Sequence, residues 1–420
     1  MMQGRVREKA GGQNKVVELT QDNVGEITRG LPFHARHALR ALTRMHHGSL
    51  TVELPGGAAY HFKAPGQGPE AELVIHDWRF ARRAIMGGSV GVAESYMDGD
   101  WTSPDVTAFL SLFLANEELY RNVATPNWFN NALQKLNHWF NQNSRRGSRR
   151  NIASHYDLGN EFYSRWLDST MTYSSAIFEE GDNSLAAAQR SKYRSLAKSA
   201  HMGSGQHVLE IGCGWGGFAE YAAKEVGCHV TGLTISREQY DFARERMFRQ
   251  GLNERVEIKF QDYRDETGKY DAIASIEMFE AVGEKYWPAY FGKLHDCLKA
   301  GGRAGLQIIT IADTSYDYYR SHPDFIQRYI FPGGMLPSPS ILSRLSIEHG
   351  LTLMSERMFP RDYARTLAEW REKFVSAWED IRPMGFDLRF KRMWEFYLHY
   401  CEAGFLSDNI DVRQLFYQRS

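Results

Sequence analysis

Residues 207–218, HVLEIGCGWGGF, contain the feature that decides the fold. An apolar run at 208–211 is followed by four glycines among the next six residues, and then by the segment FAEYAA at 218–223, which favours a helix. A strand, a sharp turn and a helix are therefore predicted in direct succession. Glycines let such a turn bring its backbone close to a ligand, which the free N–H groups of the helix then face.

The sequence downstream of this turn repeats the same alternation. Apolar runs that we interpret as strands lie at 229–233, 256–260, 270–276 and 303–311. Helical spacing lies at 284–299 and at 236–250, where Ser236 and Gln239 have the spacing of a capping box. Strands that alternate with helices predict an α/β fold with a parallel sheet.

The residues before this domain have a different pattern. Residues 1–25 are polar and are expected to form a flexible tail. Residues 26–125 combine three short alternating runs between 48 and 77 with two helical segments, and turn residues such as PGG at 55–57 separate the runs. This pattern predicts a small α+β domain whose strands form an antiparallel sheet.

A basic linker is predicted at 126–152. Its aromatic residues at helical spacing precede the run RRGSRR at 145–150. Arginines beside Trp and Phe suit the surface of an anionic membrane, and a solvated linker is the alternative interpretation. Binding of nucleic acid is not expected, because no aromatic stacking residues interleave with the charges.

The composition narrows the class of protein. The formal net charge of the 420 residues is −1, which argues against a dedicated nucleic-acid-binding protein. The four cysteines form no C-x-x-C pair, and the four histidines at 34–47 have no acid or cysteine at ligand spacing, so no metal site is expected. Without a signal-peptide core or a run of about 18 apolar residues, the chain is expected to be cytoplasmic.

Seven segments in a fixed order resemble one enzyme family. They are HYDLGNEFY (155–163), MTYSSAIF (171–178), VLEIGCGWGG, GLTISREQ, QDYRD, MFEAVG (278–283) and YIFPGGMLPS (329–338). Together they are similar to the cyclopropane-fatty-acyl-phospholipid synthases, a family that includes the mycolic acid cyclopropane synthases. The resemblance implies a class I SAM-methyltransferase domain at 153–420, with a Rossmann-like sheet and helical, lipid-binding insertions at 314–345 and 370–400.

The same resemblance implies S-adenosylmethionine (SAM) as the cofactor. The spacing E-x-G-x-G-x-G-G at 210–217 resembles motif I of class I SAM methyltransferases rather than a G-x-G-x-x-G dinucleotide fingerprint. The cofactor residues implied by position are Tyr173, Ser174, Gly212, Gly214, Gly216, Thr234, Gln239, Asp262 and Tyr263. Helix capping by Gln239 and core packing of Tyr263 are the alternative roles.

Members of this family also hold a bicarbonate ion that serves as the base, and the resemblance implies its ligands here. Glu280 and Tyr363 match the family's glutamate and tyrosine, and Ile309 supplies the backbone N–H. Ser175 stands at the cysteine position and Gln307 at the histidine position. Because Ser and Gln still donate hydrogen bonds, bicarbonate stays a candidate ligand, but the changed partners leave ring closure in question. Glu280 as a structural, ion-paired acid is the alternative.

These observations predict a SAM-dependent C-methyltransferase that acts on the double bond of unsaturated acyl chains in membrane phospholipids. The favoured product is a cyclopropane ring, and the alternative within the family is an uncyclised, methyl-branched chain. A small-molecule N- or O-methyltransferase and a lipid-binding protein with a vestigial cofactor fold are the alternatives outside it. The expected partner is the bilayer surface, contacted peripherally from the cytoplasmic side, and the resemblance also allows a homodimer.

Overall fold

The computed structural model describes residues 16–119 and 158–420, which divide into two compact units. Unit 1 consists of Met1–Leu133 and Gly385–Ser407, and unit 2 of Gln134–Met384 and Asp408–Ser420. The whole of the predicted basic linker, residues 126–152, lies outside the described residues. No helix in the two described ranges is long and apolar enough to cross a bilayer.

Unit 1 is built on a five-stranded sheet in the order β1-β3-β2-β4-β5. The strands are β1 (Val16–Glu18), β2 (His47–Glu53), β3 (Ala59–Lys63), β4 (Gly66–Ile75) and β5 (Trp101–Thr102). The predicted antiparallel arrangement is wrong in part, because the chain reverses after β3 and places β4 on the other side of β2, parallel to it. The predicted flexible tail is also too long, since β1 pairs with β3.

The helices of unit 1 include one that the sequence assigned to the catalytic domain. They are α1 (Val24–Ile27), α2 (Phe33–Leu42), α3 (Arg79–Met97), α4 (Val106–Ala115) and α17 (Leu388–Leu406). α17 packs against α3 and α4, and the Thr107 hydroxyl on α4 bonds to His399 and Glu402 on α17. Residues 385–407 therefore belong to unit 1, and the boundary predicted at 153–420 does not hold for them.

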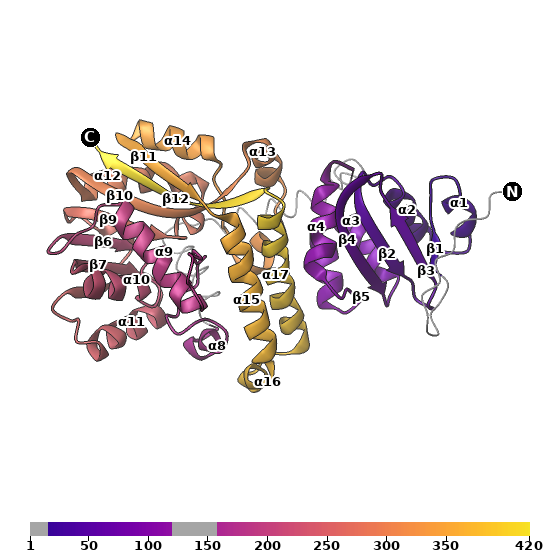
Figure 1. Ribbon diagram of the computed structural model, residues 1–420, viewed down its shortest axis with the longest axis horizontal. Helices are drawn as coiled ribbons and strands as arrows, with labels where there is room; N and C mark the ends of the chain where they lie inside the picture. The colour runs from indigo at the N-terminus through magenta and orange to yellow at the C-terminus, as the bar shows by residue number, and fades with distance from the viewer. Residues whose placement is uncertain (1–15, 120–157) are drawn as a thin grey trace. The chain divides into compact units, whose positions relative to one another are not determined.

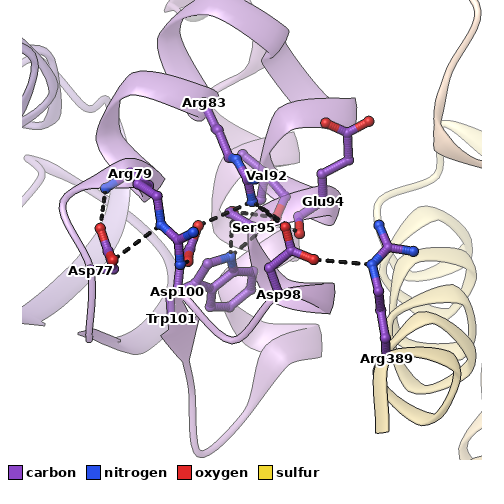
Figure 2. A network of polar contacts seen from close by, with 10 residues as sticks. All are labelled: Asp77, Arg79, Arg83, Val92, Glu94, Ser95, Asp98, Asp100, Trp101 and Arg389. Carbon is purple, nitrogen blue, oxygen red and sulfur yellow. Dashed lines mark hydrogen bonds and ion pairs between the residues drawn. The ribbon is translucent and has the colours of Figure 1, made fainter. Parts of the chain in front are cut away.

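A network of ion pairs fixes α3 to its neighbours in unit 1 (Figure 2). Asp100 is buried between Arg79, at 2.6 Å, and Arg83, at 3.1 Å. Asp98 joins Arg83 to Arg389, the latter on α17. Two arginines beside Asp100 compensate its burial, which nevertheless raises the pKa of that carboxyl. We interpret the network as structural, because its charges are paired with one another.

Unit 2 contains a seven-stranded sheet in the order β11-β12-β10-β9-β6-β7-β8 (Figure 1). Its strands are β6 (His207–Ile211), β7 (His229–Thr234), β8 (Val256–Phe260), β9 (Tyr270–Ile276), β10 (Leu298–Ile311), β11 (Leu351–Met358) and β12 (Ile410–Arg419). Among these seven strands, β12 runs antiparallel to the other six. The parallel sheet predicted from the alternation is confirmed for β6 to β10.

Helices cover both faces of this sheet. They are α8 (Asn160–Ser164), α9 (Leu185–Ser199), α10 (Gly217–Tyr221), α11 (Arg237–Arg249), α12 (Trp287–Cys297), α13 (Asp313–Ser321), α14 (Pro339–Glu348), α15 (Pro360–Ser376) and α16 (Trp378–Ile381). Alternate residues of the strands face different cores: Leu209 packs with side chains of α12 and α14, and Val208 with those of α9, α10 and α11. This layering leaves the carboxyl ends of the parallel strands for a site.

Candidate active site

The glycine turn at the carboxyl end of β6 has the backbone that the sequence predicts. Gly212, Gly214 and Gly216 have φ angles of 83°, 52° and 82°, which side chains other than glycine rarely adopt. A Cβ atom at Gly214 would meet no heavy atom within 4 Å, whereas at Gly212 it would lie 2.7 Å from Met278 Cγ. Gly214 therefore opens onto free space that suits a ligand, whereas Gly212 and Gly216 permit close packing of the turn.

The predicted ribose-side residues lie at the carboxyl end of β7. The Thr234 hydroxyl donates to Gln239 Oε1 at 2.9 Å and accepts from the Ser236 N–H at 3.1 Å. The Ser236 hydroxyl caps α11 by accepting from the Gln239 N–H. Capping and side-chain pairing thus occur together, and they fix Gln239 with its carboxamide oxygen turned toward Thr234.

The two predicted adenine-side residues follow β8. The Asp262 carboxylate is engaged by Arg264 through Nε at 2.8 Å and Nη2 at 2.6 Å. The Tyr263 ring packs edge-on against Tyr290, with 5.4 Å between ring centroids. Burial raises the pKa of Tyr263, so its hydroxyl stays protonated. Tyr263 therefore presents a partly buried aromatic surface. The carboxylate of Asp262 is held by its ion pair with Arg264.

Tyr173 and Ser174 connect the cofactor side to the carboxylates described below. The Tyr173 ring lies against Trp166 and Trp370, at 5.5 and 5.3 Å between centroids. The Ser174 hydroxyl accepts a 2.6 Å bond from Lys192 Nζ, and the Ser174 carbonyl accepts from Gln189. An aromatic wall and a buried polar anchor therefore hold this segment from both sides.

A cluster of two carboxylates and their donors occupies the carboxyl ends of β9 and β10. We call it the acid cluster, and its members are Ser175, Glu277, Glu280, Gln307, Ile309 and Tyr363. Glu277 accepts three hydrogen bonds, from the Ser175 N–H at 2.8 Å, Gln307 Nε2 at 2.7 Å and the Tyr363 hydroxyl at 2.6 Å. Such donors stabilise the ionised carboxylate.

Glu280 is bound more sparsely. One oxygen accepts from the Ile309 N–H at 2.5 Å, and the other is buried with no hydrogen-bond partner among the described residues. Burial, together with the charge of Glu277, raises the pKa of Glu280 to about 8. Burial also raises the pKa of Glu277, although its hydrogen-bond donors and the charge of Lys192 lower it. The three donors and Lys192 favour the ionised form of Glu277, whereas Glu280 has one donor, so Glu280 is the member of the pair that retains a proton more readily.

The acid cluster does not fit the bicarbonate that the family resemblance implies. The donors assigned to that anion at Tyr363, Gln307 and Ile309 are engaged by Glu277 and Glu280. The Ser175 hydroxyl donates to the Ala176 carbonyl, so that Ser175 contributes its backbone N–H instead. A carboxylate belonging to the chain thus takes the place of an external anion.

Sequence reasoning missed Glu277, Lys192 and Gln414. Glu277 has a φ angle of 49°, unusual for a residue with a side chain, and such strain is typical of functional positions. Gln414 on β12 donates to Gln307 Oε1 and fixes the orientation of that amide. The one available signal for Glu277 was its position directly after a predicted strand, three residues before Glu280; no local pattern indicated Lys192 or Gln414.

Comparison with known families identifies this arrangement. Residues 143–415 match the family model of mycolic acid cyclopropane synthetase. The chain belongs to this family. It is 40% identical over 343 residues to the tuberculostearic acid methyltransferase UfaA1 of Mycobacterium tuberculosis, covering 80% of each chain. It is 36% identical over 364 residues to the cyclopropane-fatty-acyl-phospholipid synthase of Escherichia coli K12, covering 86% of this chain and 90% of the relative.

Solved structures of family members agree with the fold of unit 2. The mycolic acid cyclopropane synthase CmaA1, solved with SAH and CTAB, superposes with a TM-score of 0.61 at 27% identity, over 64% of this chain and 98% of that one. The family resemblance and the class I methyltransferase fold are thus confirmed, and the protein is a SAM-dependent methyltransferase. The open space beside Gly214 is compatible with a bound cofactor. Tyr173, Ser174, Thr234, Gln239 and Tyr263 stay predictions of the residues that would hold it.

Proposed function

We propose that this enzyme transfers the methyl group of SAM to a double-bond carbon in an unsaturated acyl chain of a membrane phospholipid, and that the product is methylated but not cyclised. The observation that carries the proposal is the acid cluster, in which Glu277 holds the donors implied for bicarbonate. The relatives support the substrate class, since one is named for a fatty acid and another for fatty-acyl phospholipids.

The methyl-transfer step requires positioning and exclusion of water. Bound SAM supplies an electrophilic methyl group, and an alkene is a weak nucleophile, so the two carbons must be held at about 3–3.5 Å. Gln307 and Tyr363 are buried, at only 1% and 6% exposed, and Glu277 beside them is partly buried, so little water reaches these groups. Aromatic faces such as that of Tyr173 stabilise the cation that forms on the acyl chain.

The cation is then neutralised by loss of a proton to Glu277. A C–H bond next to the cationic carbon breaks, its electron pair forms a new carbon–carbon double bond, and the proton moves to the Glu277 carboxylate. The exomethylene product forms when a 1,2-hydride shift first moves the cation onto the methyl-bearing carbon and the new methyl group then loses the proton. Glu277 is the base because its three donors favour the ionised form. Glu280 is protonated at neutral pH because its pKa is raised to about 8, and it therefore does not compete for this proton.

The absence of ring closure in this proposal is supported by the changed partners. In the family the ring-closing base is an ion held partly by a cysteine and a histidine, whereas Ser175 and Gln307 here bind protein groups. The retained Glu280, Ile309 and Tyr363, with the likeness to the E. coli synthase, support ring formation as the second candidate.

Product analysis separates these candidates. Purified enzyme is incubated with SAM and vesicles of a monounsaturated phospholipid, and the acyl products are examined by proton NMR. We expect vinylic-methyl or exomethylene signals without upfield cyclopropyl protons. Cyclopropyl protons would instead support the second candidate, and no modified lipid would contradict both. Mass spectrometry alone cannot decide, because both products gain CH2.

The substrate implies where the enzyme acts. Acyl chains of phospholipids are reached from a bilayer surface, so the proposal includes peripheral binding on the cytoplasmic side of the membrane. The basic run at 145–150, predicted from the sequence, supplies the positive charge for anionic headgroups. Co-sedimentation with vesicles that contain or lack anionic lipid tests this part, and equal binding to both would contradict it.

A further inference from the structure

Lys192 is a buried cation that the scheme above leaves without a role. It lies on α9, its side chain is fully buried, and its Nζ donates to the Ser174 hydroxyl at 2.6 Å. Burial of an ammonium group is unfavourable unless hydrogen bonds and opposite charges compensate it. The neutral hydroxyl and the ring of Tyr193, whose centroid lies 4.8 Å from Nζ, compensate only part of this cost, so the charges around Lys192 have to be considered.

Three carboxylates act on this ammonium group, and the largest effect comes from Glu277, followed by Asp168 and Glu210. Burial lowers the pKa of Lys192 to about 7 in spite of them. Lys192 in turn lowers the pKa of Glu277, which burial raises. Lys192 and Glu277 are therefore electrostatically coupled.

Hydrogen bonds also link the two residues by two routes. On the first, Lys192 binds the hydroxyl of Ser174, and the next residue, Ser175, donates its N–H to Glu277. On the second, Gln414 donates to the Lys192 carbonyl and to Gln307, which in turn donates to Glu277. The geometry thus ties both ends of Lys192 to the acid cluster.

We infer that Lys192 is a positioning residue, whose buried ammonium group is the counter-charge that keeps Glu277 ionised while an acyl chain excludes water from the site. Its bond to Ser174 also holds the cofactor-side segment against the acid cluster. An apolar acyl chain removes water from Glu277 and so disfavours its ionised form. The fixed charge of Lys192 offsets this penalty, and its ammonium group does not contact the reacting carbons. The inference rests on the proposed function of Glu277 as the base.

Other groups face this pair and were considered for the pH dependence. From the elements packed around it they are Asp168, Tyr193, Glu210, Arg246, Glu280 and Tyr363. Arg246 acts on Glu210 and Tyr193, and the charge of Glu277 contributes to the raised pKa of Glu280. Lys192 is thus the one cation among these groups that acts on Glu277.

Kinetics of charge-removing and charge-retaining variants test the role. In Lys192→Met the loss of the cation raises the pKa of Glu277, so the acid limb of the kcat profile moves upward by about one pH unit; kcat falls by up to about ten-fold at pH values below the wild-type limb and recovers at higher pH. Lys192→Arg retains the charge and keeps the wild-type limb. Lys198→Met, on the exposed side of the same helix, is the control. A Lys192→Met variant that lowers kcat equally at every pH would overturn the inference.

A second measurement is independent of turnover. NMR of isotope-labelled lysine side chains should show one lysine titrating near neutral pH, and this signal should be missing from Lys192→Met. Glu277→Gln should shift its titration to lower pH, because a compensating negative charge is removed. An unchanged titration in Glu277→Gln would contradict the coupling. If wild-type enzyme gave no lipid product, the proposed function would fail, while this titration would still decide whether Lys192 and Glu277 form a pair.

Discussion

The glycine turn after β6 and the acid cluster after β9 use the same unusual backbone conformation for opposite purposes. Gly214 and Glu277 have φ angles of 52° and 49°. At Gly214 the missing side chain leaves space beside the backbone, which suits a cofactor. At Glu277 a side chain is present despite the strain, and its carboxylate holds donors that the family uses for an ion. The glycine turn thus leaves space for a ligand, whereas at the acid cluster a protein carboxylate occupies the corresponding position.

The two regions also differ in how they are assembled. The cofactor turn comes from one continuous segment. The acid cluster instead combines residues from the loop before α9, from the segment directly after β9 with its 3-10 turn, from β10 and from α15. A contiguous turn depends on backbone geometry, whereas the cluster depends on hydrogen bonds and charge in a buried environment. Substitutions in the two regions should therefore affect separate properties, cofactor affinity in one and proton transfer in the other.

The largest effect is expected from Glu277→Gln. The amide keeps the shape but cannot accept a proton, so kcat should fall by about a thousand-fold, within the usual range for loss of a general base. SAM affinity, measured by calorimetry, should stay within about three-fold, because Glu277 belongs to the other region. A variant that keeps more than a tenth of the wild-type kcat would contradict the role of Glu277.

Glu277→Gly sharpens the same comparison. It removes the backbone strain, which costs about 1–2 kcal/mol, and clears the position of the carboxylate. We expect an unchanged or higher melting temperature, with activity that is lost but partly restored by added acetate or bicarbonate. Restoration by these anions and not by chloride would identify the missing group as a carboxylate base.

An intermediate effect is expected at the cofactor turn. In Gly214→Ala the new Cβ enters the free space and the φ angle becomes unfavourable, so SAM affinity should fall by at least about ten-fold. Gly251→Ala is the matched control, because Gly251 also has a positive φ angle, 68°, and free space around it, but lies after α11. Equal SAM affinity in both variants would contradict the assignment of the space beside Gly214 to the cofactor.

The same contrast explains what the sequence could predict. The strand, turn and helix at 207–223 follow from local composition, and the order of β6 to β10 follows from alternating patterns. Glu280, Tyr363, Gln307 and Ile309 are brought together as the resemblance implies. Glu277 was missed because a backbone conformation, and not a residue pattern, makes it part of the site. Lys192 was missed because a contact with Ser174, 18 residues before it in the sequence, brings it there.

The boundaries of the units show a similar limit. Residues 370–400 were interpreted as a lipid-side helix pair from alternating aromatic and basic residues. α15 does contribute Tyr363 to the acid cluster, whereas α17 packs with α3 and α4 in unit 1. Amphipathic spacing predicts which face of a helix is buried. It does not predict which element packs against that face, because that element is distant in sequence.

The smallest effect concerns the stability of the fold and comes from the protonated member of the pair. The pKa of Glu280 is raised from its usual value of 4.5 to about 8 by burial. Between these values the unfolded chain has lost the proton that the native protein retains, so this group's stabilisation is complete at low pH and is lost as the pH rises to about 8. Glu280→Gln does not titrate and should lack this contribution. Its melting temperature relative to wild type should therefore increase by several degrees between pH 5 and pH 8, which corresponds to a few kcal/mol.

The difference between the two proteins is the relevant measurement, because Lys192 acts in the opposite direction. Its pKa is lowered to about 7, so the native protein binds fewer protons than the unfolded chain above that pH, and its contribution to stability rises with pH. Subtraction removes this contribution, and Glu254→Gln, on the surface, controls for the loss of one acidic residue. A difference that stays constant from pH 5 to pH 8 would mean that Glu280 is ionised in the native protein. Glu280 could then also accept the proton, and the assignment of the base to Glu277 would no longer be supported by the protonation of its neighbour.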